Sequence, residues 1–205
     1  MAIKSKIDGN SRISLSDDQL FDQSTANTSG GTDSTSGNTF IGYLAGQNVD
    51  AGSVNNTFIG HGVGDATLAD ATYNVGIGTN ALTELTQGDA NIVIGPGAAD
   101  ALTTGSHNIV IGYNALSAAT GSENDNIAIG SDAMGNANES GTQHNVVIGN
   151  YAGDAFGTAA VEGTTLIGYQ AGSALSHANA SYTTCIGYQA GTSITDGTGN
   201  VAIGH

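Results

Sequence analysis

A five-residue pattern, Asn-x-x-Ile-Gly, recurs throughout the chain from Asn38 to its last residues. Successive glycines of the pattern lie 17 to 19 residues apart, at Gly42, Gly60, Gly78, Gly95, Gly112, Gly130, Gly149, Gly168, Gly187 and Gly204. Self-similarity at a short fixed period is typical of a solenoid, in which each repeat forms one coil stacked on the last. We therefore predict an all-β fold, a parallel β-roll or β-solenoid of about ten coils of 17–19 residues.

The repeats divide the chain into two parts. Residues 38–205 form the predicted β-roll domain. Residues 1–37 lie outside the repeat, and we interpret them as an attachment segment followed by a spacer. Within them, residues 11–16 alternate like a short strand, and residues 24–37 are rich in Gly, Ser and Thr, as linkers are.

Each Asn-x-x-Ile-Gly segment reads as a strand whose side chains alternate between two faces. The first x is always β-branched, which favours extended backbone. It shares a face with the invariant Ile, and we predict that this face forms the interior of each coil. Three residues after the glycine, Ala is found in eight of nine repeats, and we predict a second inward position on a return strand. A coil would then contain two short strands, with the glycine permitting a tight corner that a Cβ would obstruct.

The second x lies on the opposite face, and it too is apolar. A strand on the wall of a monomeric solenoid should present polar side chains to water, so a second apolar face needs a cover. We predict that three copies converge on it as a homotrimer. The residues predicted to pack around the trimer axis are Phe40, Phe58, Val93, Val110, Ala128, Val147, Leu166, Cys185 and Ala202.

Charge excludes several classes of partner. The chain has a net charge of −15, and its three basic residues, Lys4, Lys6 and Arg12, all precede the repeats. Contacts with nucleic-acid phosphates or anionic lipid need basic side chains, so neither partner is expected. No run of about 18 apolar residues is present, so no membrane insertion is expected. The first ten residues lack the apolar core of a secretory signal peptide.

The repeats resemble two known groups. Residues 126–130 and 200–204 resemble the Asn-Ser-Val-Ala-Ile-Gly repeats of YadA-like head domains in trimeric autotransporter adhesins. Residues 41–46, 167–172 and 186–191 are still more similar to repeats of bacteriophage tail fibres and related virion proteins. The resemblance covers residues 38–205 and implies a left-handed β-roll that trimerises through one wall.

The chain also departs from the head-domain pattern in two respects. Its repeat is longer, and Thr164 and Thr183 replace the leading Asn, which should interrupt any ladder of stacked asparagines.

The resemblance favours a structural virion protein made in the host cytoplasm, either a trimeric fibre or spike or a decoration of the capsid surface. Residues 1–37 would attach to another virion protein, and the loops would face a host-surface glycan or receptor. The alternative is the head fragment of a bacterial trimeric adhesin. An ice-binding solenoid is disfavoured, because Thr occupies the first x in only four of ten coils and is predicted to point inward. The final repeat stops after its strand, so either another virion protein protects this end or a C-terminal piece has been removed, and axial association or a partner is expected there.

No motif indicates catalysis, a cofactor or a metal. Residues 76–81 match G-x-G-x-x-A, but no βαβ unit surrounds them. The five histidines lack metal-ligand spacing and are read as loop residues. A depolymerase acting on surface glycan would need paired carboxylates, and nothing pairs the loop candidates, which are Asp65, Asp70, Glu84 and Asp100.

The tyrosines of the repeat allow two interpretations, and the one cysteine allows one. Tyr43, Tyr113, Tyr169 and Tyr188 each follow the repeat glycine directly. They form either an aromatic platform for glycans or a half-buried stack that shields the corner, and the stack is favoured. Cys185 is read as a small core hydrophobe.

Overall fold

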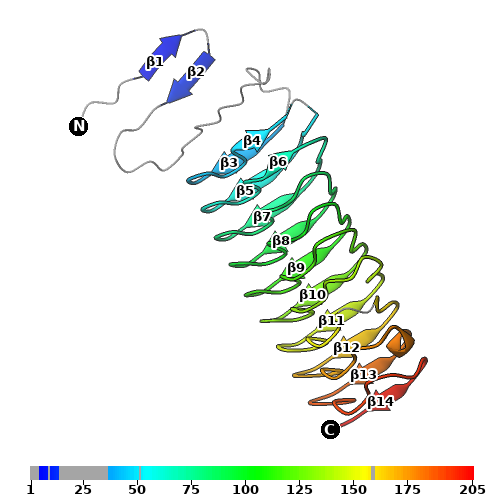
Figure 1. The fold of residues 1–205 in the computed structure, drawn as a ribbon. Helices are drawn as coiled ribbons and strands as arrows, with labels where there is room; N and C mark the ends of the chain where they lie inside the picture. The colour runs from blue at the N-terminus through cyan, green and yellow to red at the C-terminus, as the bar shows by residue number, and fades with distance from the viewer. Residues whose placement is uncertain (1–4, 9, 14–36, 51, 158–159) are drawn as a thin grey trace.

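The computed structural model describes residues 5–8, 10–13, 37–50, 52–157 and 160–205. Its main feature is a sheet of ten parallel strands, with three residues in each, that runs the length of a rod (Figure 1). In spatial order the strands are β3 (Thr39–Ile41), β5 (Thr57–Ile59), β7 (Val75–Ile77), β8 (Ile92–Ile94), β9 (Ile109–Ile111), β10 (Ile127–Ile129), β11 (Val146–Ile148), β12 (Thr165–Ile167), β13 (Thr184–Ile186) and β14 (Val201–Ile203). Nine connections join them, so the solenoid makes nine complete turns.

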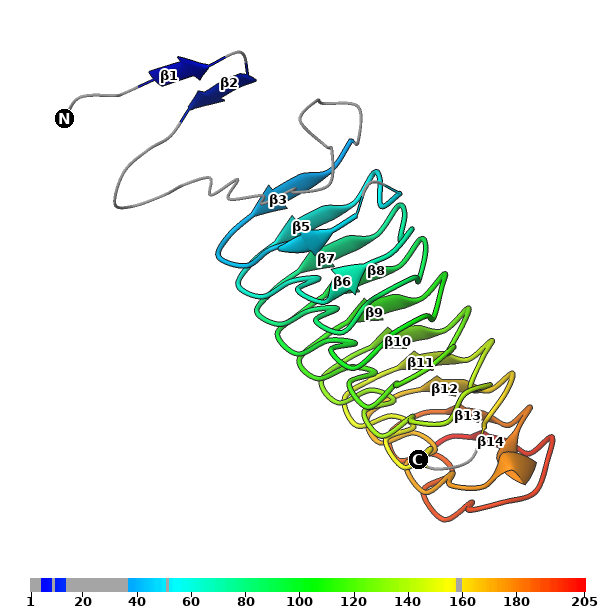
Figure 2. The same ribbon diagram turned by 45° about the horizontal axis from the view of Figure 1, so that its top comes forward.

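The register follows the sequence repeat without slippage. Ile41 pairs with Ile59, Ile59 with Ile77, and so on to Ile203, so every coil places the same repeat position at the same point of the sheet. Each connection leaves the sheet, loops round behind it and returns one strand further along (Figure 2). The predicted parallel β-solenoid is therefore confirmed.

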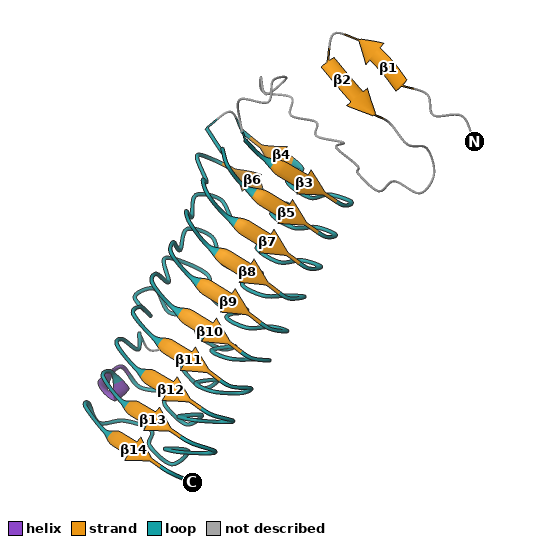
Figure 3. Cartoon of the chain, turned by 180° about the vertical axis from the view of Figure 1, so that it is seen from behind, coloured by secondary structure: helices purple, strands orange, loops and turns teal. Residues whose placement is uncertain are grey.

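Outside this sheet, regular structure is sparse. β1 (Ser5–Asp8) and β2 (Asn10–Ile13) form an antiparallel pair. The predicted strand at residues 11–16 overlaps β2 only at its start, and residues 14–36, including nearly all of the predicted spacer, lie outside the described residues. β4 (Asn48–Val49) pairs with β6 (Thr67–Leu68), and a 3₁₀ turn, η2, spans Ala178–Ala180. Loops make up the rest of each coil (Figure 3).

The predicted orientation of the strands is wrong. The second x of the pattern points into the coil, and from Phe58 to Cys185 every residue with a side chain at this position is fully buried within the chain itself. The residues predicted for the trimer axis, which are Phe40, Phe58, Val93, Val110, Ala128, Val147, Leu166, Cys185 and Ala202, belong instead to the coil interior or pack against it. The first x and the invariant Ile face outward. Alternation fixes which residues share a face, but with both faces apolar it does not say which face is inside.

Two further expectations concern the return segment. The Ala three residues after the glycine is inward, as predicted, and is fully buried from Ala81 to Ala171. The prediction of a second strand in each turn is confirmed only for the β4–β6 pair and is wrong for the other described coils. The residues two and four positions after the glycine adopt left-handed backbone in each coil, as Asn114 (φ 49°) and Leu116 (φ 53°) do, and this conformation ends any extended run.

The glycine corner is confirmed at residue level. Gly130 has φ 135°, and a Cβ added to it would lie 2.6 Å from the carbonyl of Gly149 in the next coil. Each glycine from Gly42 to Gly187 faces the following repeat glycine in the same way. Only a residue without a side chain permits this close approach of stacked backbones.

Interior side chains fill a constant space by exchanging volume among three positions of the coil. Phe40 is accompanied by Gly46, whose added Cβ would lie 2.6 Å from the phenyl ring. The trio is Val110, Leu116 and Ala119 in one coil; two coils further along it is Val147, Gly153 and Phe156. Close packing explains the compensation, because both voids and overfilling cost free energy.

A buried ladder of asparagines runs beside the interior. Asn56, Asn74, Asn91, Asn108, Asn126 and Asn145 are all fully buried. Asn91 is representative: its amide donates to Asn74 Oδ1 (3.0 Å) and to the Gly105 carbonyl (2.8 Å). Its own Oδ1 accepts from the backbone and the amide of Asn108. Both donors and both acceptor sites are satisfied, so burial carries little penalty.

The threonine replacements affect this ladder less than expected. Thr164 donates from its hydroxyl and its backbone N–H to Asn145 Oδ1, both at 2.9 Å. The hydrogen bonding therefore extends one coil beyond the last stacked asparagine, to Thr164, and the run of asparagines itself ends at Asn145.

Candidate interaction surfaces

The first candidate is the outward side of the ten-stranded sheet, hereafter the outer face. It consists of two rows, the first-x residues and the invariant isoleucines, each repeating once per strand. Side chains in the middle of the sheet remain partly open to water, with 41% of Ile92 and 36% of Ile94 exposed. Neither row contains a charged residue. At about 4.8 Å per strand and about 10 Å of strand width, the two rows cover roughly 400 Å².

The threonines of the first row occupy the ends of this face. Thr39 and Thr57 lie at one end, and Thr165 and Thr184 lie near the other. Their predicted inward orientation is wrong. From Val75 to Val146 the row is aliphatic, so the face still lacks the continuous threonine array that ice binding would need.

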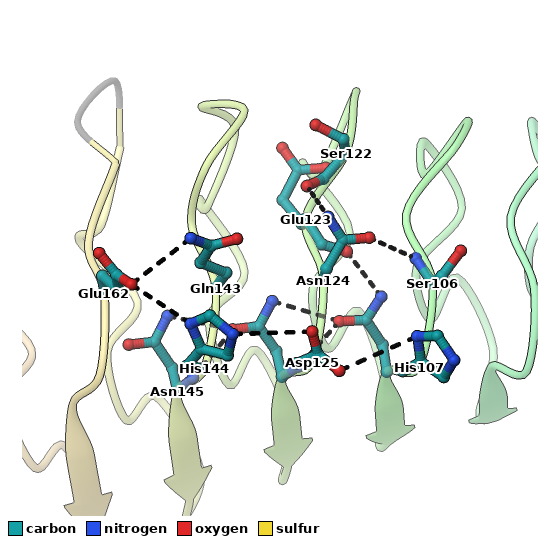
Figure 4. A network of polar contacts seen from close by, with 12 residues as sticks. Ser106, His107, Ser122, Glu123, Asn124, Asp125, Gln143, His144, Asn145 and Glu162 are labelled. Carbon is teal, nitrogen blue, oxygen red and sulfur yellow. Dashed lines mark hydrogen bonds and ion pairs between the residues drawn. The ribbon is translucent and has the colours of Figure 1, made fainter.

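The second candidate lies where the chain enters the strands, hereafter the polar edge: His107, Asp125, His144, Glu162 and Tyr182. Figure 4 shows the central members side by side on successive coils. His107 Nδ1 lies 3.9 Å from Asp125 Oδ1, and His144 lies 3.7 Å from Asp125 and 3.3 Å from Glu162. The Tyr182 hydroxyl donates to Glu162 Oε2 at 3.3 Å. Polar groups of alternating character thus link successive coils along this edge.

Left-handed backbone positions most of these side chains. His107, Asp125, His144 and Tyr182 have φ between 56° and 61° and each precedes the Asn or Thr of the buried ladder. This conformation turns the chain sharply into the strand and directs the side chain of the left-handed residue itself to the surface. Side chains one position earlier bond between coils as well, as when Ser106 N–H donates to Asn124 Oδ1 (2.8 Å).

The third candidate lies where the chain leaves the strands, hereafter the tyrosine corner: Tyr43, Tyr113, Tyr169 and Tyr188. All four are substantially exposed, from 40% for Tyr169 to 62% for Tyr43. Some of the rings stack on neighbours along the rod: Tyr43 on His61 with centroids 5.4 Å apart, and Tyr169 on Tyr188 at 5.2 Å. The stacked rings turn their faces toward one another, which leaves their edges and hydroxyls for a ligand.

The described part of the chain contains no group of three or more His, Cys, Asp or Glu residues placed to hold a metal ion. Among the carboxylates weighed for catalysis, Glu84 and Asp100 lie on adjacent coils, joined by a 3.0 Å backbone hydrogen bond. Burial, assisted by the charge of Glu84, raises the pKa of Asp100. Cys185 is buried and unpaired, and burial raises the pKa of its thiol.

Sequence reasoning missed a buried carboxyl group. Glu123 is fully buried. Its Oε2 accepts from Gly121 N–H at 3.0 Å, but its Oε1 has no partner, and neither has the Thr142 hydroxyl of the next coil. Burial raises the pKa of Glu123. The signal was available, because Glu123 lies three residues before the ladder asparagine, where other coils have Ala71, Gly88, Gly105 or Val161.

Comparison with protein families, with curated proteins and with solved structures finds no match. Among the described residues no helix is both long and apolar enough to cross a bilayer.

Proposed function

We propose that this chain is a structural rod that assembles with copies of itself through the outer face, as a homotrimer. The supporting observation is the outer face itself, an uninterrupted array of β-branched side chains without a charge on any of ten strands. The packing of a single chain does not require this array, since the core lies on the other side of the sheet. Burial against identical faces gives the array a physical role.

Burial of the two rows alone contributes a free energy comparable to the cost of association, so the two rows are not sufficient by themselves. At about 25 cal/mol per Å², burying roughly 400 Å² contributes about 10 kcal/mol per chain. Association costs of about 4–15 kcal/mol oppose this gain. Stable interfaces also bury about 800 Å² per partner, so residues that flank the two rows must contribute.

Within this class we propose a virion protein, either a fibre or spike or a capsid-surface decoration, that presents its loops for adhesion to a host surface. The proposal rests on the similarity of residues 167–172 and 186–191 to phage fibre repeats. Residues 1–37 would attach to a second virion protein. The head of a bacterial trimeric adhesin is the alternative, and the genomic neighbourhood separates the two.

Absolute mass in solution tests the assembly. Light scattering should give the mass of three 20.3-kDa chains. Ile129→Asp places one carboxylate per copy in the middle of the outer face and should yield monomers, because like charges would meet in a dry contact. Thr120→Asp, at an exposed position on an outer turn, is the matched control and should remain trimeric. A wild-type chain that is a folded monomer at micromolar concentration would refute the proposal.

A further inference from the structure

We infer that the polar edge of one copy packs against the tyrosine corner of the next, so that the assembly is a closed ring joined head to tail. This inference rests on the proposed homotrimer and specifies its orientation and seams.

Strand direction supplies the first step. All ten strands are parallel and lie like rungs across the rod (Figures 1 and 3). When three such rods stand parallel round an axis with their outer faces inward, the strands run round that axis in one direction. The end of a strand in one copy then meets the start of the corresponding strand in the next. The polar edge precedes the strands and the tyrosine corner follows them, so these two surfaces meet at each seam.

Dimensions supply the second step. Packed sheets lie about 10 Å apart, which places each sheet about 5 Å from a shared axis and makes each side of the triangle about 17 Å. At about 3.3 Å per residue this length is five residue steps. In the coil that contains β9, five steps reach from His107 to Gly112, the neighbour of Tyr113. The corners of the triangle therefore fall on the polar edge and the tyrosine corner.

An antiparallel pair related by a two-fold axis across the rods would place like edges together, whereas the head-to-tail ring joins unlike edges. In the ring the polar edge meets hydrogen-bonding groups of the tyrosine side, which are the hydroxyls of Tyr113 and Tyr169 and the amide of Asn150. Including both edges also roughly doubles the width of the contact, to about 800 Å² buried per chain, which is shared between the two seams that each chain forms.

Disulfide trapping tests the seam. In a Cys185→Ala background, His107→Cys and Tyr113→Cys are combined in one chain. Within that chain the two positions lie at opposite ends of β9, too far apart for a disulfide, which needs Cα atoms within about 7 Å. Oxidation should produce a covalent trimer on non-reducing gels, whereas each single variant should remain uncrosslinked. Asp125→Cys with Ser131→Cys repeats the test one coil further along, should the first pair fail to fold.

The outcomes separate this inference from the function on which it rests. Covalent trimer from the double variants alone supports the seam. Covalent dimer from a single variant shows that like edges meet and overturns it. No crosslink in either folded double variant, with the mass still that of a trimer, also overturns the seam but leaves the homotrimer intact. A monomeric mass removes both. His107→Cys with Thr120→Cys, which moves one thiol to an outer turn, is the matched control and should not form covalent trimer.

Discussion

The interior and the outer face of the same strands are both apolar, yet they vary differently from coil to coil. Inside, Phe, Val, Leu, Ala, Cys and even Gly occupy the middle strand position, and neighbouring positions compensate for each change in volume. Outside, the last strand position is Ile in every coil, and the first is always Thr, Val or Ile. Compensation is what packing within one chain requires. Uniform shape suits repeated contact with an identical surface, either the next coil of the same chain, as in the pairing of Ile41 with Ile59, or the proposed second copy.

Overfilling the interior should cause the largest change. In Gly153→Leu the new side chain would meet Phe156 and Leu166, because a Cβ there already lies 3.0–3.2 Å from their atoms. We expect a loss of about 3 kcal/mol in the free energy of unfolding, measured by urea denaturation. The backbone itself tolerates leucine, since Leu116 has a similar φ at the equivalent position.

Adding Phe156→Ala to Gly153→Leu sharpens the comparison. Together with Val147, the two changes recreate the Val-Leu-Ala trio that Val110, Leu116 and Ala119 form two coils earlier. The double variant should recover most of the lost stability. Two independent losses that simply add would show that interior volume is not shared between these positions.

Breaking the asparagine ladder should have a somewhat smaller effect. Asn108→Ala leaves the buried Asn91 Oδ1, the amide of Asn126 and the Glu123 carbonyl each short of a partner. We expect a loss of about 2–3 kcal/mol, from the desolvation of unsatisfied groups. Asn108→Thr keeps a donor for Asn91, as Thr164 does for Asn145, and should cost less. Equal losses for the two variants would contradict a role for the hydrogen bonds.

Glu123→Gln should stabilise the protein at neutral pH by about 1 kcal/mol, because it removes a buried carboxylate without removing the acceptor for Gly121. The pKa of Glu123 is raised above its ordinary value of 4.5, so the folded state holds the proton more tightly than the unfolded state. Its contribution is therefore most favourable below about pH 4.5 and is lost as the pH rises through the raised pKa.

Unfolding titrations between pH 4 and pH 8 would measure this difference. The advantage of the Gln variant should be greatest at the alkaline end and should diminish toward pH 4. An advantage that is independent of pH would indicate that the charge of Glu123 is not its cause.

A substitution on the outer face should have the smallest effect on the folding of each chain. Ile94→Thr changes a side chain that is 36% exposed, and it should alter the unfolding free energy of a single chain by less than about 1 kcal/mol. Assembly should respond more strongly, with trimers dissociating at a higher protein concentration in sedimentation experiments. If folding and assembly weaken equally, the outer face serves the single chain and the contrast with the interior disappears.

Particular residues show how far sequence reasoning reached. The glycine corner at Gly130, the buried Ala115 and the ten-strand register all followed from the period, because a repeat places equivalent residues one above another. The interaction surfaces were harder. Tyr113 and Tyr188 were found by their shared position and shared residue type. The polar edge was missed because His107, Asp125 and His144 differ in type, although each directly precedes the repeat Asn. Left-handed backbone before each ladder position aligns them, and no local pattern reveals it.

The sequence by itself determined a parallel solenoid, its register and the two opposed apolar faces of its strands, since these depend on repeat length and on the alternation of side chains. Only the tertiary structure decided which face is the core. Phe58 and Ile59 are both apolar, and the choice between them depends on how the return segment turns behind the sheet. That turn brings Val63 and Gly64 behind Phe58, and strand periodicity does not relate these residues.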